Sequence, residues 1–433
     1  MAIWDLDKNR YKSNNGKLFE VVMVAGQTGP TVYTPSGNLN AASDAFGRLR
    51  VSEPHTLFDS SFRFNDNAER WNTRITGTGA VTHNTDEGLM DITVGNADGD
   101  EVVRQTDRTF GYQPGKSLLI MNSFTMSTPK TNLRQRVGYF TKDNGFYVEA
   151  DGTDIYLVKR SSVTGSVVET KIAQADWNVD KLDGTGTSEV TLNFSKSQIM
   201  WMDVEWLGVG SIRMGFIVNC QFLLAHVFHH ANDIEGTYIT TGSLSLRSEI
   251  TNTGVTTGST TYKQICSTVI SEGGYDRTGL TRSVANPFPG RSLSDSGENP
   301  MVSIRLRQGR TEAVVHPREI TMYGYQNTPF QLKIIRGGEL SGGSWELVDS
   351  ASSVEYNLSA TDIQNGTTIF SQIFKGQSTI TPTDLFVQFS GEIQLTRGII
   401  TGDSEGDLFT VVINPNTNND DALAAVTWQE KTT

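Results

Sequence analysis

The fold class follows from one stretch, Gly145-Phe146-Tyr147-Val148-Glu149-Ala150-Asp151-Gly152-Thr153-Asp154-Ile155-Tyr156-Leu157-Val158-Lys159-Arg160. Apolar side chains alternate in 145–150 and again in 154–160, with the period of two that places every second residue on one face of a strand. The Asp-Gly pair between the two runs is a strong signal for a tight hairpin turn. The sequence therefore predicts a β-hairpin here.

The same pattern continues on both sides of this hairpin. Strands are expected at 118–126, 134–140, 200–206, 211–219, 222–228 and 262–271, and the polar stretch 251–260 is expected to be a loop. Helical periodicity is scarce, and no fixed-period repeat points to a propeller or a solenoid. Many antiparallel strands at this spacing predict a β-sandwich or a jelly roll.

Composition divides the chain of 433 residues into sections. Residues 1–57 contain one apolar run, 18–25, and are expected to form an extended N-terminal arm for attachment. Residues 58–285 are dense enough in apolar strands for one jelly-roll β-sandwich, and the three prolines in 286–300 suggest a linker. Residues 301–433 resume the strand pattern. The expected fold is all-β: an extended arm, a central jelly-roll or lectin-like β-sandwich and a C-terminal β-sandwich.

Charge argues against nucleic-acid and membrane partners. The formal net charge is -12, and the basic residues form no cluster that would attract a phosphate backbone. No apolar stretch is long enough to span a bilayer and the first residues do not resemble a signal peptide, so we expect a soluble compartment. Cys220 and Cys266 lie in apolar runs, which suits buried free thiols better than a disulfide.

One short stretch, Trp201-Met202-Asp203-Val204-Glu205-Trp206, combines acidic and aromatic residues. In a strand Trp201, Asp203 and Glu205 share a face. The stretch resembles the Glu-x-Asp-x-Glu strand of laminarinase-like jelly-roll glycoside hydrolases, in which Asp203 would match the helper carboxylate and Glu205 the acid/base. Trp201 stands where the nucleophile is needed, so we expect no catalytic residues. Trp201, Asp203, Glu205 and Trp206 remain candidates for glycan binding, because tryptophan stacks on sugar rings.

The sequence predicts no metal site and no cofactor. His226, His229 and His230 fall at the end of an expected strand, where His226 and His230 are too far apart to share one metal, although a helix would bring all three together. The acidic turns 96–100 and 402–407 contain oxygen ligands for calcium but lack the twelve-residue spacing of a calcium loop. A Gly-x-Ser-x-Gly nucleophile motif and a phosphate-binding glycine loop are both absent.

A second resemblance concerns the stretch Ala45-Phe46-Gly47-Arg48-Leu49-Arg50-Val51-Ser52-Glu53-Pro54-His55-Thr56-Leu57-Phe58-Asp59-Ser60. It resembles a signature near the start of structural proteins of tailed bacteriophages, especially marine ones. The stretch 204–216 is also similar to those proteins, and the similarity extends over about residues 40–250. The resemblance implies a virion component without an active site, and leaves open whether it decorates the head, belongs to the tail or forms a fibre.

An assembly contact can be proposed within this signature. Its residues are Phe46, Arg48, Leu49, Arg50 and Val51, a short basic strand that follows the polar arm. Such a strand could add to the sheet edge of a neighbouring subunit, with the arginines pairing to carboxylates. The alternative is that the same run packs within its own sandwich.

Together these observations predict a non-enzymatic structural component of a bacteriophage virion that acts through protein–protein contacts. Its expected partners are other capsid or tail proteins, with a homotrimer as the assembly unit. Its expected location is the virion, and the host cytoplasm during assembly. The alternatives are a receptor module that binds a host surface glycan, a polysaccharide depolymerase using Asp203 and Glu205, and an assembly chaperone, which the scarcity of helices disfavours.

Overall fold

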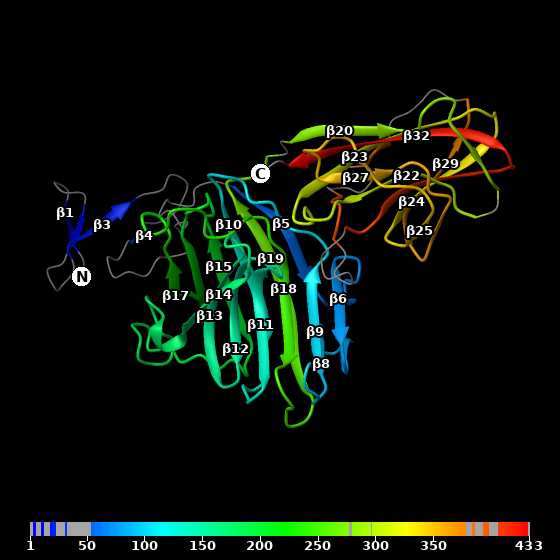
Figure 1. Ribbon diagram of the computed structural model, residues 1–433. Coiled ribbons are helices and arrows are strands. Elements are labelled where there is room, and N and C mark those ends of the chain that lie inside the picture. Colours follow the sequence, from blue (N-terminus) through cyan, green and yellow to red (C-terminus); the bar gives the residue numbers. More distant parts are fainter. Residues whose placement is uncertain are drawn as a thin grey trace.

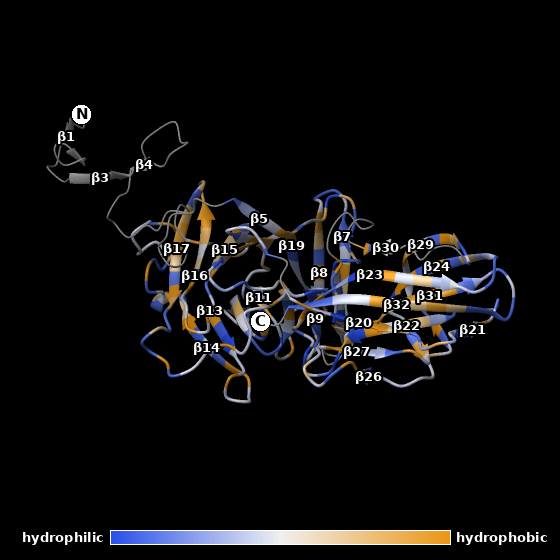
Figure 2. Cartoon of the chain, turned by 90° about the horizontal axis from the view of Figure 1, so that it is seen from above, coloured by the Kyte–Doolittle hydropathy of each residue, from blue (hydrophilic) through white to orange (hydrophobic). Residues whose placement is uncertain are grey.

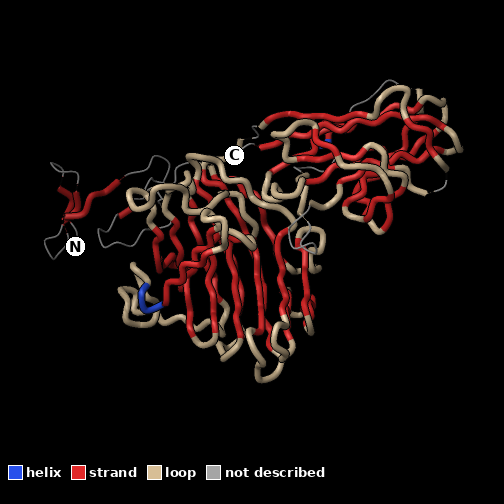
Figure 3. Tube along the Cα trace, in the orientation of Figure 1, coloured by secondary structure: helices blue, strands red, loops and turns tan. Residues whose placement is uncertain are grey.

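The computed structural model describes residues 53–276, 279–295, 297–377, 383–385, 393–397 and 406–431, together with the backbone of four short strands nearer the N-terminus. The all-β prediction is confirmed: strands dominate, and one short 3-10 helix, Gln174–Asp176, is drawn in Figure 3. No described helix is long and apolar enough to cross a membrane.

Two facing sheets form the first sandwich (Figure 1). The eight-stranded sheet contains, in spatial order, β17 (Gln221–Phe228), β16 (Ile212–Val218), β15 (Gln198–Val204), β10 (Ser117–Thr125), β19 (Thr260–Glu272), β8 (Leu89–Val94) and β7 (Gly79–Asn84), and its eighth strand is β5 (Pro54–Ser61). β5 and β8 pair with successive parts of the same edge of β19. The first sandwich thus begins at Pro54, a few residues before the predicted boundary.

The seven-stranded sheet contains the predicted hairpin. Its strands are, in spatial order, β14 (Val168–Ala173), β13 (Asp154–Ser161), β12 (Gly145–Asp151), β11 (Leu133–Phe140), β18 (Leu246–Asn252), β9 (Glu101–Thr106) and β6 (Trp71–Thr76). β12 and β13 pair from Gly145 opposite Arg160 to Asp151 opposite Asp154, which confirms the hairpin. Gly152 has a φ of +63°, a conformation that costs glycine little.

Alternating side chains fill the space between the two sheets. Ile120 on β10, Met202 on β15 and Val148 on β12 are fully buried in one continuous hydrophobic core. Burying a side chain of this size contributes about 1.5–3 kcal/mol. The outward residues of the same strands cover the two outer faces of the sandwich, and these are the surfaces available for function.

The C-terminal section forms a second sandwich with its own core. One sheet contains β20 (Leu280–Ala285), β32 (Asp420–Lys431), β23 (Val314–Gly324), β30 (Thr383–Asp384) and β21 (Arg291–Leu293); the other contains β26 (Glu346–Leu347), β27 (Val354–Asn357), β22 (Pro300–Leu306), β31 (Phe409–Pro415), β24 (Pro329–Arg336) and β29 (Thr367–Lys375). A small pair, β25 (Glu339–Ser341) and β28 (Asp362–Gln364), completes the described strands.

The prediction that residues 286–300 form a linker is wrong. Residues 280–285 already form β20, which pairs with β32, and residues 291–293 form β21 on the same strand. The buried Asn286 donates a hydrogen bond to the carbonyl of Met301, which ties the intervening segment to the sandwich. The chain passes from one sandwich to the other between Glu272 and Leu280, so the second sandwich begins about twenty residues before the predicted boundary.

Only backbone is described for the N-terminal section. β1 (Ile3–Asp5), β2 (Arg10–Lys12), β3 (Leu18–Val22) and β4 (Thr31–Val32) pair in that order. The proposed assembly residues Phe46, Arg48, Leu49, Arg50 and Val51 lie outside the described residues. The docking arm therefore stays a prediction.

A polar joint connects the two sandwiches. The guanidinium of Arg336 on β24 pairs with the carboxylate of Asp107 at 2.5 Å. Arg397 is 2% exposed; its backbone N–H donates to the carbonyl of Asp107 at 3.1 Å and its guanidinium donates to the hydroxyl of Ser245 at 2.9 Å. The hydroxyl of Thr141 also donates to a carboxylate oxygen of Glu312 at 2.9 Å. Contacts of this kind fix the orientation of one sandwich on the other.

Candidate functional site

The outer face of the seven-stranded sheet is closed by its own side chains. Phe140 and Tyr147 lie on it with their ring centroids 4.4 Å apart. The guanidinium groups of Arg136 and Arg160 lie 5.1 and 5.0 Å from the centre of the Tyr147 ring. These cation–π contacts leave both rings buried.

Carboxylates complete this layer. Arg136 pairs with Glu149 at 2.5 Å, with Glu169 at 3.1 Å and with Glu249 at 3.3 Å. Burial opposes ionisation of Glu249, but the charges of Arg247 and Arg136 outweigh it and lower the pKa of Glu249 to about 2. The charges on this face pair with one another, which is the arrangement of a structural ion-pair network.

The predicted residues of β15 occupy the opposite outer face, that of the eight-stranded sheet. Trp201 and Asp203 point outward as expected, yet Trp201 is 3% exposed. The Trp201 ring packs against Phe222, with centroids 5.7 Å apart, and its indole lies above Gly215, where a Cβ would come within 2.8 Å. Asp203 is fully buried and forms an ion pair with Arg213 on β16. An ion pair of this kind is typical of a carboxylate with a structural role.

Glu205 and Trp206 lie beyond the end of β15. Glu205 is fully buried and accepts a hydrogen bond from the hydroxyl of Tyr112 at 2.8 Å. Burial and the charge of Glu205 raise the pKa of Tyr112. Trp206 packs edge-on against Tyr112 and lies, partly buried, against the core of the sandwich. The four residues Trp201, Asp203, Glu205 and Trp206 therefore do not form the accessible glycan-binding face expected from the sequence. The first three are buried, and the strand ends before Glu205 and Trp206.

The histidines are packed individually at the end of β17. His226 accepts a hydrogen bond from the backbone of Asn178 at 3.2 Å, and His230 stacks on Tyr238 with ring centroids 3.8 Å apart. Burial lowers the pKa of both histidines to about 4. Among the described residues, no three side chains of metal-binding type lie together.

The two cysteines are free thiols. Cys220 is exposed in the turn between β16 and β17, at a φ of +61°, so the expectation that it is buried is wrong. Cys266 lies on β19 and is partly exposed. The two thiols thus differ in accessibility and position.

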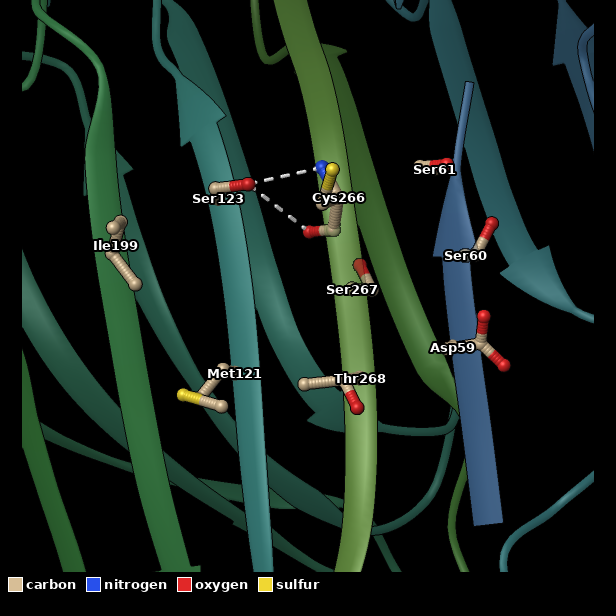
Figure 4. A pocket seen from close by; sticks show the side chains of 9 residues that line it. All are labelled: Asp59, Ser60, Ser61, Met121, Ser123, Ile199, Cys266, Ser267 and Thr268. Atoms are coloured by element: carbon tan, nitrogen blue, oxygen red, sulfur yellow. Dashed lines mark hydrogen bonds between the residues drawn. The ribbon is translucent and has the colours of Figure 1, made fainter. Parts of the chain in front are cut away.

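A shallow groove lies on the outer face of the eight-stranded sheet and has a volume of about 340 Å³. It is lined by residues of β5, β10, β15 and β19, namely Asp59, Ser60, Ser61, Met121, Ser123, Ile199, Cys266, Ser267 and Thr268 (Figure 4). The sequence could not indicate this site, because strands far apart along the chain contribute its residues. The groove is the candidate functional site.

Two β-bulges shape the groove. The register between β10 and β19 shifts at Ser123, and the register between β19 and β5 shifts at Val269. The Ser123 hydroxyl accepts a hydrogen bond from the backbone N–H of Cys266 at 3.0 Å and lies 3.4 Å from the carbonyl of the same residue, toward which it can donate. Bulges are common at functional sites because they redirect side chains.

The lining is polar on one side and apolar on the other. Asp59, Ser61 and Thr268 present oxygen atoms, whereas Met121 and Ile199 present hydrocarbon, and Ile199 is 42% exposed. Hydrophobic residues continue along β15, β16 and β17 in Figure 2. The groove can therefore bind an amphipathic ligand.

Comparisons with known proteins find similarity only to solved structures; no family model and no curated protein matches the chain. A Bacteroides ovatus mixed-linkage glucan GH16 bound to a product is 9% identical, with 49% of this chain and 99% of that chain covered and a TM-score of 0.34. A legume lectin-like domain from Entamoeba histolytica is 11% identical (49% and 95% covered, TM-score 0.32). The CBM2 module of the evolved Dit of Lactobacillus casei BL23 phage J-1 is 6% identical (52% and 98% covered, TM-score 0.33). These neighbours are carbohydrate-binding and glycoside hydrolase proteins, and identities this low say nothing about what this chain binds.

Proposed function

We propose that this chain is a non-catalytic structural component of a tailed-bacteriophage virion. The resemblance of residues 45–60 to phage structural proteins supports a location in the phage particle. The proposal covers a head decoration, a fibre or a tail-associated protein. Its partners are other capsid or tail proteins, and three copies form its assembly unit.

The observation that carries the proposal is the polar joint between the sandwiches. Arg397 and Asp107 are both buried there, and the ion pair between Asp107 and Arg336 spans the boundary. A buried, hydrogen-bonded joint resists hinge motion, because opening it would leave charged groups unpaired. Two sandwiches held in this way make a rigid block suited to repeated contacts in a particle.

The burial of the acidic residues supports a non-catalytic role. Glycoside hydrolysis needs two accessible carboxyl groups flanking the scissile bond. Asp203 is paired with Arg213 and Glu205 with Tyr112, and both carboxylates are fully buried. We therefore expect no sugar release from polysaccharides in a reducing-sugar assay, and no effect of Glu205→Gln on that result.

Purified particles provide the test. Quantitative mass spectrometry should detect the chain at a fixed copy number divisible by three, and light scattering of the purified protein should give the mass of a trimer. Absence of the chain from mature particles would contradict the proposal, and a monomer at particle-forming concentrations would contradict the trimer.

A second candidate function is glycan binding, and the groove on the eight-stranded sheet favours it. Its hydroxyl, carboxylate and apolar groups suit a sugar, and it lies on an outer face of the first sandwich. A glycan array with the full chain tests this function. Binding without turnover supports a receptor module, whereas release of sugar would restore the depolymerase alternative.

A further inference from the structure

We propose that the groove between β5, β10, β15 and β19 binds internal units of a neutral glycan chain. The inference rests on the second candidate function and gives it a site and a ligand class. The residues concerned differ from the tryptophan and carboxylate residues that the sequence suggested.

The amphipathic lining matches the two sides of a pyranose ring. Asp59 lies in the exposed part of β5, and among the described residues its carboxylate has no ion-pair partner, so it can accept hydrogen bonds from sugar hydroxyls. The hydroxyls of Ser61 and Thr268 flank it, and that of Thr268 already donates to the carbonyl of Phe58 and retains acceptor capacity. Ligand hydroxyls would face these oxygens.

The opposite side of the groove accepts hydrocarbon. Met121 and Ile199 come from the adjacent strands β10 and β15, on the side away from β5. The C–H face of a sugar ring can cover them and remove apolar surface from water. A ligand that is polar on all sides would leave this apolar surface exposed.

Charge selects a neutral ligand. Among the described residues that line the groove, Asp59 is the only charged one, and the whole chain carries a formal net charge of -12. An acidic sugar would place its carboxylate beside that of Asp59. The guanidinium of Arg70, which donates to the backbone carbonyl of Asp59 at 2.7 Å, is not among the residues that line the groove. Acidic glycans should therefore bind more weakly than neutral ones of the same length.

The size and shape of the groove favour binding of internal sugar units over binding of the end of a glycan. The volume of about 340 Å³ lies at the lower end of the range for small-molecule sites, about 300–1,000 Å³. The groove is shallow, and hydroxyls continue beyond it on β10, where Thr125 hydrogen-bonds Ser197 at 3.1 Å. Sugar units next to the occupied position can thus continue along the sheet toward Thr125.

The two cysteines allow a direct test in the native chain. Cys266 lines the groove, whereas Cys220 is exposed in the turn beyond β16. The rate of iodoacetamide alkylation at each thiol is measured by peptide mass spectrometry, with cellohexaose, laminarihexaose, maltohexaose or chitohexaose present, and with hexagalacturonate as the acidic probe. At least one neutral hexasaccharide should slow alkylation of Cys266 at least about fivefold at saturation and leave Cys220 unchanged.

Variants of one exposed residue provide the second measurement. Asp59→Asn removes the charge and retains the shape, and should weaken hexasaccharide binding about tenfold in calorimetry, because an amide oxygen accepts a weaker hydrogen bond than a carboxylate oxygen. Asp86→Asn, in an exposed turn away from the groove, is the matched control and should bind like the wild type. Both variants should keep the wild-type melting temperature.

The outcomes of these experiments distinguish failure of the groove assignment from failure of the proposed functions. If a glycan binds but Cys266 is not protected, or if Asp59→Asn binds normally, the groove assignment is overturned while glycan binding stands. Equal protection by hexagalacturonate overturns the neutral class. If no glycan on an array binds, the groove and the second candidate function both fall, and the copy number in particles still decides the structural role.

Discussion

Replacing Arg136 by methionine should destabilise the first sandwich strongly. Methionine keeps much of the length and hydrocarbon of the side chain but removes the guanidinium. Arg136 forms ion pairs with Glu149, Glu169 and Glu249, and its own side chain is 6% exposed. The substitution therefore leaves three carboxylates on one face with one cation fewer.

The magnitude follows from burial. Breaking a buried ion pair costs about 3–5 kcal/mol, because the remaining charge stays desolvated. Lys171 still pairs with Glu149, Arg160 with Glu169 and Arg247 with Glu249, so the loss should lie near the lower limit, at about 3 kcal/mol.

Urea unfolding followed by tryptophan fluorescence measures this loss. With a slope of about 3 kcal/mol per molar urea, the midpoint should fall by about 1 M. Lys263→Met is the control, because the Lys263–Glu87 pair is exposed (34% and 50%) and should contribute about 0–1 kcal/mol. An Arg136→Met protein as stable as the wild type, or one destabilised no more than the control, would refute the reasoning.

Three further predictions use the same structure. The pKa of Glu249 is about 2 in the folded state against an ordinary value of 4.5. Its stabilising contribution of about 3 kcal/mol is therefore present above pH 4.5 and is lost as the pH falls through 2. In Glu249→Gln, the free energy of unfolding should depend less on pH between these two values. Gly138→Ala should cost about 3 kcal/mol in urea unfolding, because its Cβ would lie 2.2 Å from a backbone oxygen, whereas Gly236→Ala meets nothing within 4 Å and should be neutral; equal stabilities would contradict the contact. Arg336→Met leaves Asp107 buried without its ion-pair partner and should split a single calorimetric transition into two, one for each sandwich; an unchanged single transition would mean that the joint does not couple them.

Local patterns predicted local structure well. The hairpin of β12 and β13 follows from alternation and an Asp-Gly turn, which act over sixteen residues. β18 was missed, and part of it was expected to be loop, because Arg247, Ser248 and Glu249 interrupt the apolar alternation. Arg247 donates to Glu249 on the same strand and to Gln105 on β9. A strand with charged residues on its outer face is therefore not recognised by a search for alternating apolar residues.

Pairings between distant segments could not be predicted. β20 and β32 pair although about 140 residues separate them, so nothing local indicated that 286–300 lies inside a sandwich. Pro300 begins β22, a position where a missing N–H is tolerated, and its presence suggested a linker instead. The groove was missed for the same reason, since it exists only where β5, β10, β15 and β19 are brought together.

The β15 residues were predicted correctly in one respect. Alternation placed Trp201 and Asp203 on the outer face of a strand, and both are there. The sequence could not show that Arg213 lies opposite Asp203 on β16, or that the strand ends before Glu205. An acidic pair thus becomes two separate buried contacts.

The pairing of β20 with β32 also determines what a tag would report. Leu280 lies opposite Glu430, so the start of β20 and the end of β32 lie together. Figure 1 shows them at the end of the second sandwich that faces the first. A gold particle or fluorescent protein attached after Lys431 would consequently mark the middle of the molecule in an electron micrograph. An epitope inserted in the turn 416–419, at the other end of β32, would mark the far tip, and the two labels together would give the polarity of the subunit on a particle.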